Sequence, residues 1–274
     1  MAPGDDELER VIAAVAESRR YRDIAPELTR RFAKQALIAA RDDVAEAVKR
    51  TKRHLHQVFG AYLPTPPRYA RLVAELRAAV ETSADERDTE VRRVLSRAMQ
   101  LHASTRERLP IIESFYRTIF ARTGRPQRVM DVGCGLNPLA TPWMELPADC
   151  HYHAIDIDAG MMQFIGATLT LLGVAHTSEV ADALATPPTA AADVAFLLKT
   201  LPCFAQQEPD SGLALIQRLN APMVVTSFPT RSLGGIKKGM EDHYARNFEA
   251  SAAERGLHID RMIFLGELVY VVQK

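Results

Sequence analysis

The sequence predicts a mixed α/β fold, in which an all-helical segment precedes a doubly wound, mostly parallel sheet with an antiparallel last strand. Up to residue 110, apolar residues recur every three or four positions, as in amphipathic helices. From residue 125, short β-branched runs alternate with segments long enough for crossover helices, which favours parallel strands. About one residue, Gly266, separates the last two runs, so they should pair as an antiparallel hairpin.

The predicted helical domain covers residues 1–109, and the predicted sheet domain covers residues 110–274. Pro26 suits the first turn of a helix, whereas Pro64, Pro66 and Pro67 end another. Residues 103–109 are expected to form a loop before a helix that starts near Pro110. The expected helices cover residues 8–15, a stretch from Pro26, and residues 44–62, 68–80 and 89–102.

Six β-branched runs are expected to be strands, and one more strand is assumed before Asp182. An open sheet that ends in a reversed hairpin is typical of the Rossmann-like class I methyltransferase fold. The runs are VMDV (129–132), YHAIDI (152–157), VAFLL (194–198), MVVTSF (223–228), RMIFL (261–265) and ELVYVV (267–272).

The composition, 47% hydrophobic and 25% charged, is that of a globular protein. No apolar run approaches the ~18 residues of a membrane span, and the start MAPGDDELER is too acidic for a signal peptide, so we expect a cytoplasmic protein without a membrane partner. Cys134, Cys150 and Cys203 lack CxxC spacing, so neither a disulfide nor a metal site is expected. Residues 1–110 contain 21 Lys and Arg against 17 Asp and Glu, and the remainder 13 against 17, so the basic excess lies in the helical segment.

The end of the first expected strand carries two glycines, Gly133 and Gly135, which allow a tight turn and a close approach to a ligand. Asp156 closes the next strand 23 residues after Gly133, where an acid can accept hydrogen bonds from ribose hydroxyls. Pro138 replaces the third glycine of a dinucleotide motif, which favours S-adenosylmethionine over NAD. The sequence therefore predicts a nucleoside pocket; the alternative is a purely structural turn.

Two more residues are expected at the same edge of the sheet, because successive parallel strands end there. Asp182 follows the assumed third strand and is placed to accept a hydrogen bond from the adenine amine, or else to cap a helix in solvent. Lys199 ends the strand 194–198, where the methyl-accepting atom must lie. A surface lysine at a strand end is common, so the position alone does not decide its role.

Six sequence blocks are spread in order over nearly the whole chain: KRTKR (49–53), HASTRERLP (102–110), GLNPLA (135–140), LLKTLP (197–202), FPTRSLG (228–234) and VYVVQK (269–274). Together they resemble the aminoglycoside-resistance methyltransferases that modify guanine 1405 of 16S rRNA. The resemblance is strongest to the type with which aminoglycoside-producing actinomycetes protect their own ribosomes.

The resemblance implies methyl transfer from S-adenosyl-L-methionine to guanine N7, with S-adenosyl-L-homocysteine as product and aminoglycoside resistance as consequence. N7 keeps a lone pair at neutral pH, so the reaction requires no general base. Arg108 suits the methionine carboxylate, because a guanidinium forms two parallel hydrogen bonds with it. By resemblance, the cofactor contacts are Tyr62, His102, Ala103, Ser104, Arg108, Gly133, Gly135, Asp156, Asp182, Ala183, Leu198 and Gln207.

One face of the expected helix 44–62 is basic and lies about a third of a turn from its apolar stripe. We expect this face to contact phosphates of 16S rRNA on the 30S ribosomal subunit, and not DNA, through sequence-independent ionic contacts. Its residues are Lys49, Arg50, Lys52, Arg53 and His56. Further basic residues that can extend the RNA contact are Arg19, Arg20, Arg22, Arg30 and Arg31, with Lys237 and Lys238 in a later loop.

A guanine stacked in a ribosomal helix must be extruded and held against an aromatic or apolar surface near the methyl donor. Phe204, Trp143 and Phe228 are candidate surfaces, and Phe204 is preferred, so Lys199 and Phe204 are the expected catalytic residues. We expect a monomer. Three alternatives stay open: a small-molecule methyltransferase with a helical lid, a 16S rRNA adenine-N1 methyltransferase, and a non-catalytic RNA-binding protein on the same fold.

Overall fold

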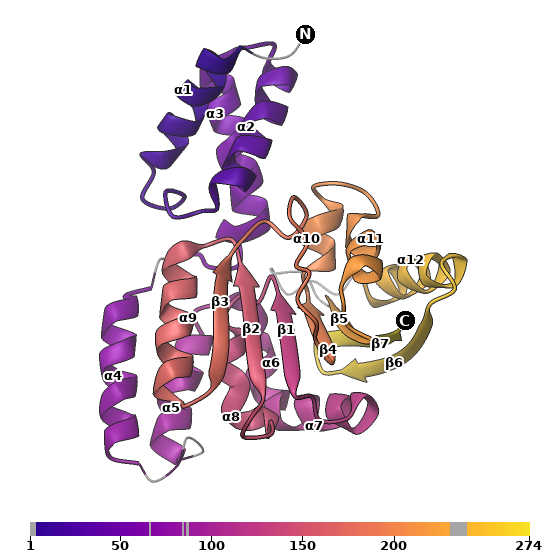
Figure 1. Ribbon diagram of the computed structural model, residues 1–274. Helices are drawn as coiled ribbons and strands as arrows, with labels where there is room; N and C mark the ends of the chain where they lie inside the picture. The colour runs from indigo at the N-terminus through magenta and orange to yellow at the C-terminus, as the bar shows by residue number, and fades with distance from the viewer. Residues whose placement is uncertain (1–3, 66, 84, 86–87, 231–239) are drawn as a thin grey trace.

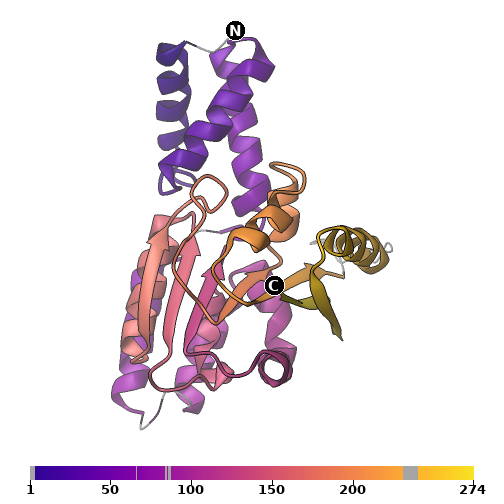
Figure 2. The same cartoon turned by 45° about the vertical axis from the view of Figure 1, so that its right-hand side comes forward.

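The computed structural model describes residues 4–65, 67–83, 85, 88–230 and 240–274. Three N-terminal helices stand over one end of a seven-stranded sheet that has helices on both faces (Figures 1 and 2). The predicted sheet, doubly wound and mostly parallel with an antiparallel last strand, is confirmed. Before residue 128, the described part of the chain forms helices and one isolated bridge at Ile24.

The first three helices follow the predicted amphipathic pattern and form what we call the N-terminal bundle. Pro26 occupies the first turn of its helix, where no N–H is needed. Asp43 caps the third helix by accepting a hydrogen bond from the amide of Glu46. That helix continues as a π-helical turn, His56–Gly60, instead of the α-helix to residue 62 that the sequence predicts. The helices are α1 (Asp5–Ala16), α2 (Pro26–Ala40) and α3 (Val44–Leu55).

The next four helices lie along the sheet, with α4 packed on a crossover helix, α9 (Ala159–Leu171). The prediction of a loop at 103–109 is wrong, because Ala103–Arg108 form the short helix α6. Pro110 does not prevent this helix, since it lies beyond its end, in a 3₁₀ turn at Leu109–Ile111. The other three helices are α4 (Tyr69–Glu81), α5 (Thr89–Met99) and α7 (Ile112–Thr123).

The sheet has the strand order β3-β2-β1-β4-β5-β7-β6. The first five strands in this order are parallel, and β7 runs antiparallel between β5 and β6. Gly266 turns the β6–β7 hairpin with a φ of +83°. All six predicted strands are confirmed. The strands are β1 (Arg128–Val132), β2 (His151–Asp156), β3 (Ala175–Val180), β4 (Val194–Leu198), β5 (Met223–Pro229), β6 (His258–Phe264) and β7 (Glu267–Gln273).

The strand order reverses at β1, which lies between β2 and β4. The connections on either side of β1 therefore leave in opposite directions and open a crevice at the carboxyl ends of these strands. The bundle lies above this edge of the sheet in both views (Figures 1 and 2). The remaining connecting helices are a 3₁₀ turn (Asn137–Ala140), α8 (Thr141–Met144), α10 (Leu201–Ala205), α11 (Ser211–Arg218) and α12 (Met240–Glu254).

One apolar core runs without interruption from the bundle into one face of the sheet, and a second core covers the other face. Backbone hydrogen bonds add to this contact: the amide of Ala25 donates to the carbonyl of Ile157 at 2.7 Å, and the amide of Ala159 donates to the carbonyl of Asp23 at 2.8 Å. The bundle is thus fixed against the loop that follows β2. The boundary between residues 109 and 110 stays a prediction. Among the described residues, no helix has the length and apolar character needed to cross a membrane.

Candidate functional site

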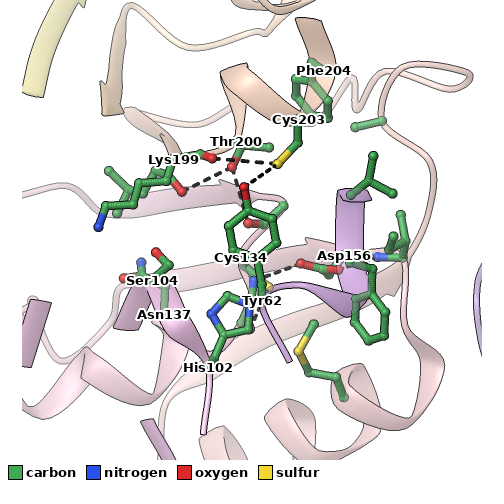
Figure 3. A pocket seen from close by; sticks show the side chains of 18 of the residues that line it. Tyr62, His102, Ser104, Cys134, Asn137, Asp156, Lys199, Thr200, Cys203 and Phe204 are labelled. Atoms are coloured by element: carbon green, nitrogen blue, oxygen red, sulfur yellow. Dashed lines mark hydrogen bonds between the residues drawn. The ribbon is translucent and has the colours of Figure 1, made fainter. Parts of the chain in front are cut away.

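A pocket opens at the carboxyl ends of β1, β2 and β4, and we call it the central pocket (Figure 3). It holds about 830 Å³ of space, its open mouth included, which suits a ligand the size of a nucleoside derivative. The bundle and the segment after it line one side through Leu28, Val58, Phe59 and Tyr62. The pocket is therefore shared between the N-terminal bundle and the sheet.

The predicted glycine turn forms the floor of this pocket. Gly133 and Gly135 have φ angles of +64° and +51°, in the left-handed region that favours glycine. A Cβ atom on Gly133 would lie 2.5 Å from Cγ2 of Thr200, and one on Gly135 would lie 2.7 Å from Cε1 of His102. Both positions therefore need glycine for their conformation and for the space they leave.

Asp156 reaches the pocket from the end of β2, next to the glycine turn. Its Oδ2 accepts a hydrogen bond from the amide of Gly135 at 2.8 Å, and its Oδ1 accepts one from the amide of Ile157 at 2.7 Å. Burial raises the pKa of Asp156 to about 6. Each oxygen keeps a lone pair beyond these bonds, so the carboxylate has capacity for two ligand hydroxyls.

Asp182 and Gln207 line the pocket from the segments after β3 and α10, and Ala183 lies beside them. Asp182 is buried and accepts two hydrogen bonds at Oδ2 from Arg31, from Nε at 3.1 Å and from Nη2 at 2.7 Å. Arg31 also donates to Oε1 of Gln207 at 2.6 Å. Arg31 was expected to extend the basic RNA face; instead it is paired with the pocket.

Lys199 is placed at the end of β4, directly after Leu198, and both line the pocket. Its φ of +58° is strained for a residue with a side chain. The Nζ atom is 2.7 Å from Oε2 of Glu107 and 3.5 Å from Oε2 of Glu267, and the side chain is 5% exposed. Lys199 is thus held between two acids, neither of which the sequence analysis identified.

Arg108 is fully buried and lines the pocket. Its Nε and Nη2 donate to Glu267 at 3.3 and 2.7 Å, and its Nη1 donates to Oδ1 of Asn137 at 2.7 Å. Although burial alone raises the pKa of Glu267, Arg108 and Lys199 together hold it below its usual value. Nη1 and Nη2 each keep one N–H, which leaves a two-pronged donor for a ligand carboxylate. The signal for Glu267 was a lone acid that begins an otherwise apolar strand.

His102 and Ser104 enter the pocket at the start of α6. Burial and the neighbouring cations lower the pKa of His102 to about 4, so the imidazole is neutral at pH 7, and its Nδ1 has no protein partner. The ring of Tyr62 stacks on His102 with centroids 6.0 Å apart, and its hydroxyl accepts a hydrogen bond from Sγ of Cys203 (Figure 3). Ala103 does not line the pocket; its amide donates to the carbonyl of Tyr62.

Of the three aromatic residues expected to hold a base, Phe204 alone lines the central pocket. Trp143 is wrong, because it lies in a separate hollow under the guanidinium of Arg92. Phe228 is wrong too, because it packs in the core against Tyr244, Phe248 and Tyr270. Aromatic composition alone did not indicate which face of the sheet each ring would join.

The basic face of α3 is present on the bundle. Lys49, Arg53 and His56 are exposed, and Lys52 and Arg50 are half-buried. Arg50 is paired with Glu46 on the same helix. Lys237 and Lys238 lie outside the described residues.

The cysteines and acids of the described part of the chain form no cluster of three or more groups suited to a metal ion. Cys134, Cys150 and Cys203 are buried free thiols. The chemistry available in the central pocket is therefore that of carboxylates, cations and hydrogen-bond donors around a nucleoside-sized space.

Known proteins resemble the chain over nearly its full length. The model of the family described as "Ribosomal RNA methyltransferase (FmrO)" matches residues 17–271. A Micromonospora rosea protein named 16S rRNA (guanine(1405)-N(7))-methyltransferase is 48% identical over 99% of this chain and 98% of its own, and a Serratia marcescens protein of the same name is 33% identical over 96% and 97%. The crystal structure of 16S rRNA methyltransferase RmtF in complex with S-adenosyl-L-homocysteine is 32% identical, with a TM-score of 0.85 over 99% of both chains.

Proposed function

Because the chain belongs to the ribosomal RNA methyltransferase (FmrO) family, we propose that its central pocket serves to methylate N7 of guanine 1405 in 16S rRNA, with S-adenosyl-L-methionine as methyl donor. The observation that carries the proposal is that one helix serves both ends of the reaction. α3 bears the basic face, and its π-helical continuation supplies Val58 and Phe59 to the pocket. The methylation confers resistance to aminoglycosides.

The residues of the pocket fit this cofactor. Asp156 offers acceptors for the ribose hydroxyls, and Asp182 offers one for the adenine amine. Arg108 keeps two N–H groups for the methionine carboxylate, and the buried Nδ1 of His102 still lacks a partner. Gly133 and Gly135 leave space that any side chain would fill.

The chain needs to supply no proton acceptor for the reaction itself, because guanine N7 already carries a free lone pair. When bound, S-adenosyl-L-methionine supplies an electrophilic methyl group. The protein's part is to hold the base in line with this group and to exclude water. Phe204 is proposed to support the extruded base, and the fixed charge of Lys199 to orient it at the end of β4.

Binding of the ribosome is proposed to start at the basic face of α3. Its contacts with phosphates locate the rRNA without reading its sequence, and the pocket then selects the base. We propose that the substrate is the assembled 30S subunit, that the enzyme acts as a monomer, and that it works in the cytoplasm, where ribosomes are found.

The proposal is tested by incubating the enzyme with 30S subunits and radiolabelled S-adenosyl-L-methionine. The RNA is then treated with borohydride and aniline, which break the chain at 7-methylguanosine. A single new break at guanine 1405 is the expected result, and bare 16S rRNA should be labelled more slowly. Label without a break would indicate another atom, such as adenine N1, and an unlabelled rRNA would favour a small-molecule substrate.

A further inference from the structure

Arg31 is the residue through which the N-terminal bundle reaches the nucleoside end of the pocket. It lies on α2, yet its side chain binds Asp182, which is 151 residues away in the chain, and Gln207, which is 176 residues away. Its side chain is 25% exposed, while that of Asp182 is 4% exposed. The contact is therefore a largely buried ion pair extended by an amide, and not a surface pairing.

The pairing fixes which atoms Asp182 and Gln207 can offer. Both lone pairs of Oδ2 of Asp182 are taken by Arg31, and Oδ1 accepts one bond from the amide of Leu184, which leaves one acceptor position on Oδ1. The Oε1 of Gln207 faces Arg31 and its Nε2 donates to the carbonyl of Cys203. The amide is thus held in one orientation, with one N–H remaining.

The helix that carries Arg31 is itself anchored beside Asp156. Its first residues follow the segment 23–25, which is hydrogen-bonded to residues 157 and 159 in the loop after β2. Leu28, one turn before Arg31, lines the pocket directly. A shift of the bundle would therefore move the partner of Asp182 relative to the site of the ribose.

We infer that Arg31 is a positioning residue that orients Asp182 and Gln207 for the adenosine end of the cofactor and couples cofactor affinity to RNA docking by the bundle. The inference rests on the proposed function for the identity of both ligands. Coupling of this kind is reciprocal: if docking on the 30S subunit changes cofactor affinity, the cofactor changes 30S affinity by the same factor.

The first test measures S-adenosyl-L-homocysteine affinity of the free protein by calorimetry, without RNA. Arg31→Ala is expected to weaken binding at least about tenfold, and Arg31→Lys, which keeps the charge but loses the planar fork, by less. The matched control is Arg30→Ala, which removes the same charge from the adjacent position of α2, where Arg30 pairs with the exposed Glu9. It should change the affinity by less than about twofold.

The second test measures 30S affinity with and without S-adenosyl-L-homocysteine. In the parent protein and in Arg30→Ala, the ligand should change 30S affinity by about fivefold or more, and in Arg31→Ala by about one. Thermal midpoints recorded for each variant separate a loss of folding from a loss of positioning.

Two results would overturn the inference. Arg31→Ala could bind the ligand as well as Arg30→Ala does, or it could bind more tightly than the parent, which would make Arg31 a competitor for Asp182. A parent protein that binds the ligand but methylates no rRNA would instead contradict the proposed function, and the effect of Arg31 on ligand affinity would still be measurable.

Discussion

The backbone amide of Gly135 donates a 2.8 Å hydrogen bond to the carboxylate of Asp156, and this bond joins the glycine turn after β1 to the acid that ends β2. The two residues are 21 positions apart, and both were predicted from the sequence to face a nucleoside. The bond orients the carboxylate toward the pocket. It also ties the conformation of the turn to the charge of Asp156.

Cofactor affinity should depend on pH through Asp156. Its buried carboxyl has a pKa of about 6, and a proton there competes with the ribose hydroxyls. If the ionised form alone binds, lowering the pH from 7.5 to 5.5 should weaken S-adenosyl-L-homocysteine binding about fourfold. Calorimetry at the two pH values measures this. Asp156→Asn should bind weakly at both values; if its affinity falls as steeply as the parent's, Asp131 or Asp158, each with a pKa of about 6, is responsible.

The glycine turn gives a prediction with a matched control. Gly133→Ala combines a positive φ with a Cβ 2.5 Å from Thr200, whereas Gly173→Ala has a φ of +70° and open space around the new methyl group. Gly173→Ala should lower stability by about 1 kcal/mol and leave cofactor affinity unchanged. Gly133→Ala should lower stability further and weaken S-adenosyl-L-homocysteine binding at least about tenfold. Equal affinities of the two variants would show that the space at Gly133 does not serve the ligand.

Local sequence signals predicted the parts of the site that lie within one strand and its following turn. Gly133, Gly135 and Asp156 form such a signal, because strand, turn and acid follow at fixed spacings. β3 was assumed but not located, because its edge position leaves mostly polar, exposed residues and no apolar run. The helix α6 was missed because Pro110 was interpreted as excluding a helix before it.

Long-range pairings could not be predicted in this way. Glu267 reaches Arg108 across 159 residues, and Arg31 reaches Asp182 across 151. Periodicity indicates which face of a helix is apolar, but not which of its arginines meets a carboxylate of another layer. Trp143 and Phe228 were misplaced for the same reason: an aromatic residue suits a core and a ligand pocket equally.

The basic face of α3 should act on RNA binding without affecting the cofactor. Replacing Lys49, Lys52 and Arg53 together by Ala should weaken 30S binding and lower its salt dependence by about one unit of log–log slope per lost phosphate contact. Affinity for S-adenosyl-L-homocysteine should stay the same. Filter binding over a range of salt concentrations provides the slopes. A control with Arg71, Arg93 and Arg97 replaced by Ala removes three charges from α4 and α5; an equal change in slope there would argue against a specific role for α3.

Lys199 should affect the chemical step more than cofactor binding. It is held at the end of β4 by Glu107 and lies 3.5 Å from Glu267, so its charge is fixed at the edge of the pocket where the methyl acceptor must arrive. Lys199→Met keeps much of the side-chain volume and removes the charge. Single-turnover methylation of 30S subunits should slow by about 10²-fold, the usual loss when one fixed electrostatic contact is removed from an active site.

A second variant separates this role from simple support of the fold. Glu107→Gln keeps an oxygen that can accept from Nζ of Lys199, so the lysine can stay in place. Methylation by Glu107→Gln should fall by less than about tenfold, and both variants should bind S-adenosyl-L-homocysteine within about threefold of the parent. If the two variants lose activity and thermal stability to the same extent, Lys199 serves to hold α6 against the sheet. If Lys199→Met alone is slow while its cofactor affinity is kept, the charge acts on the bound guanine.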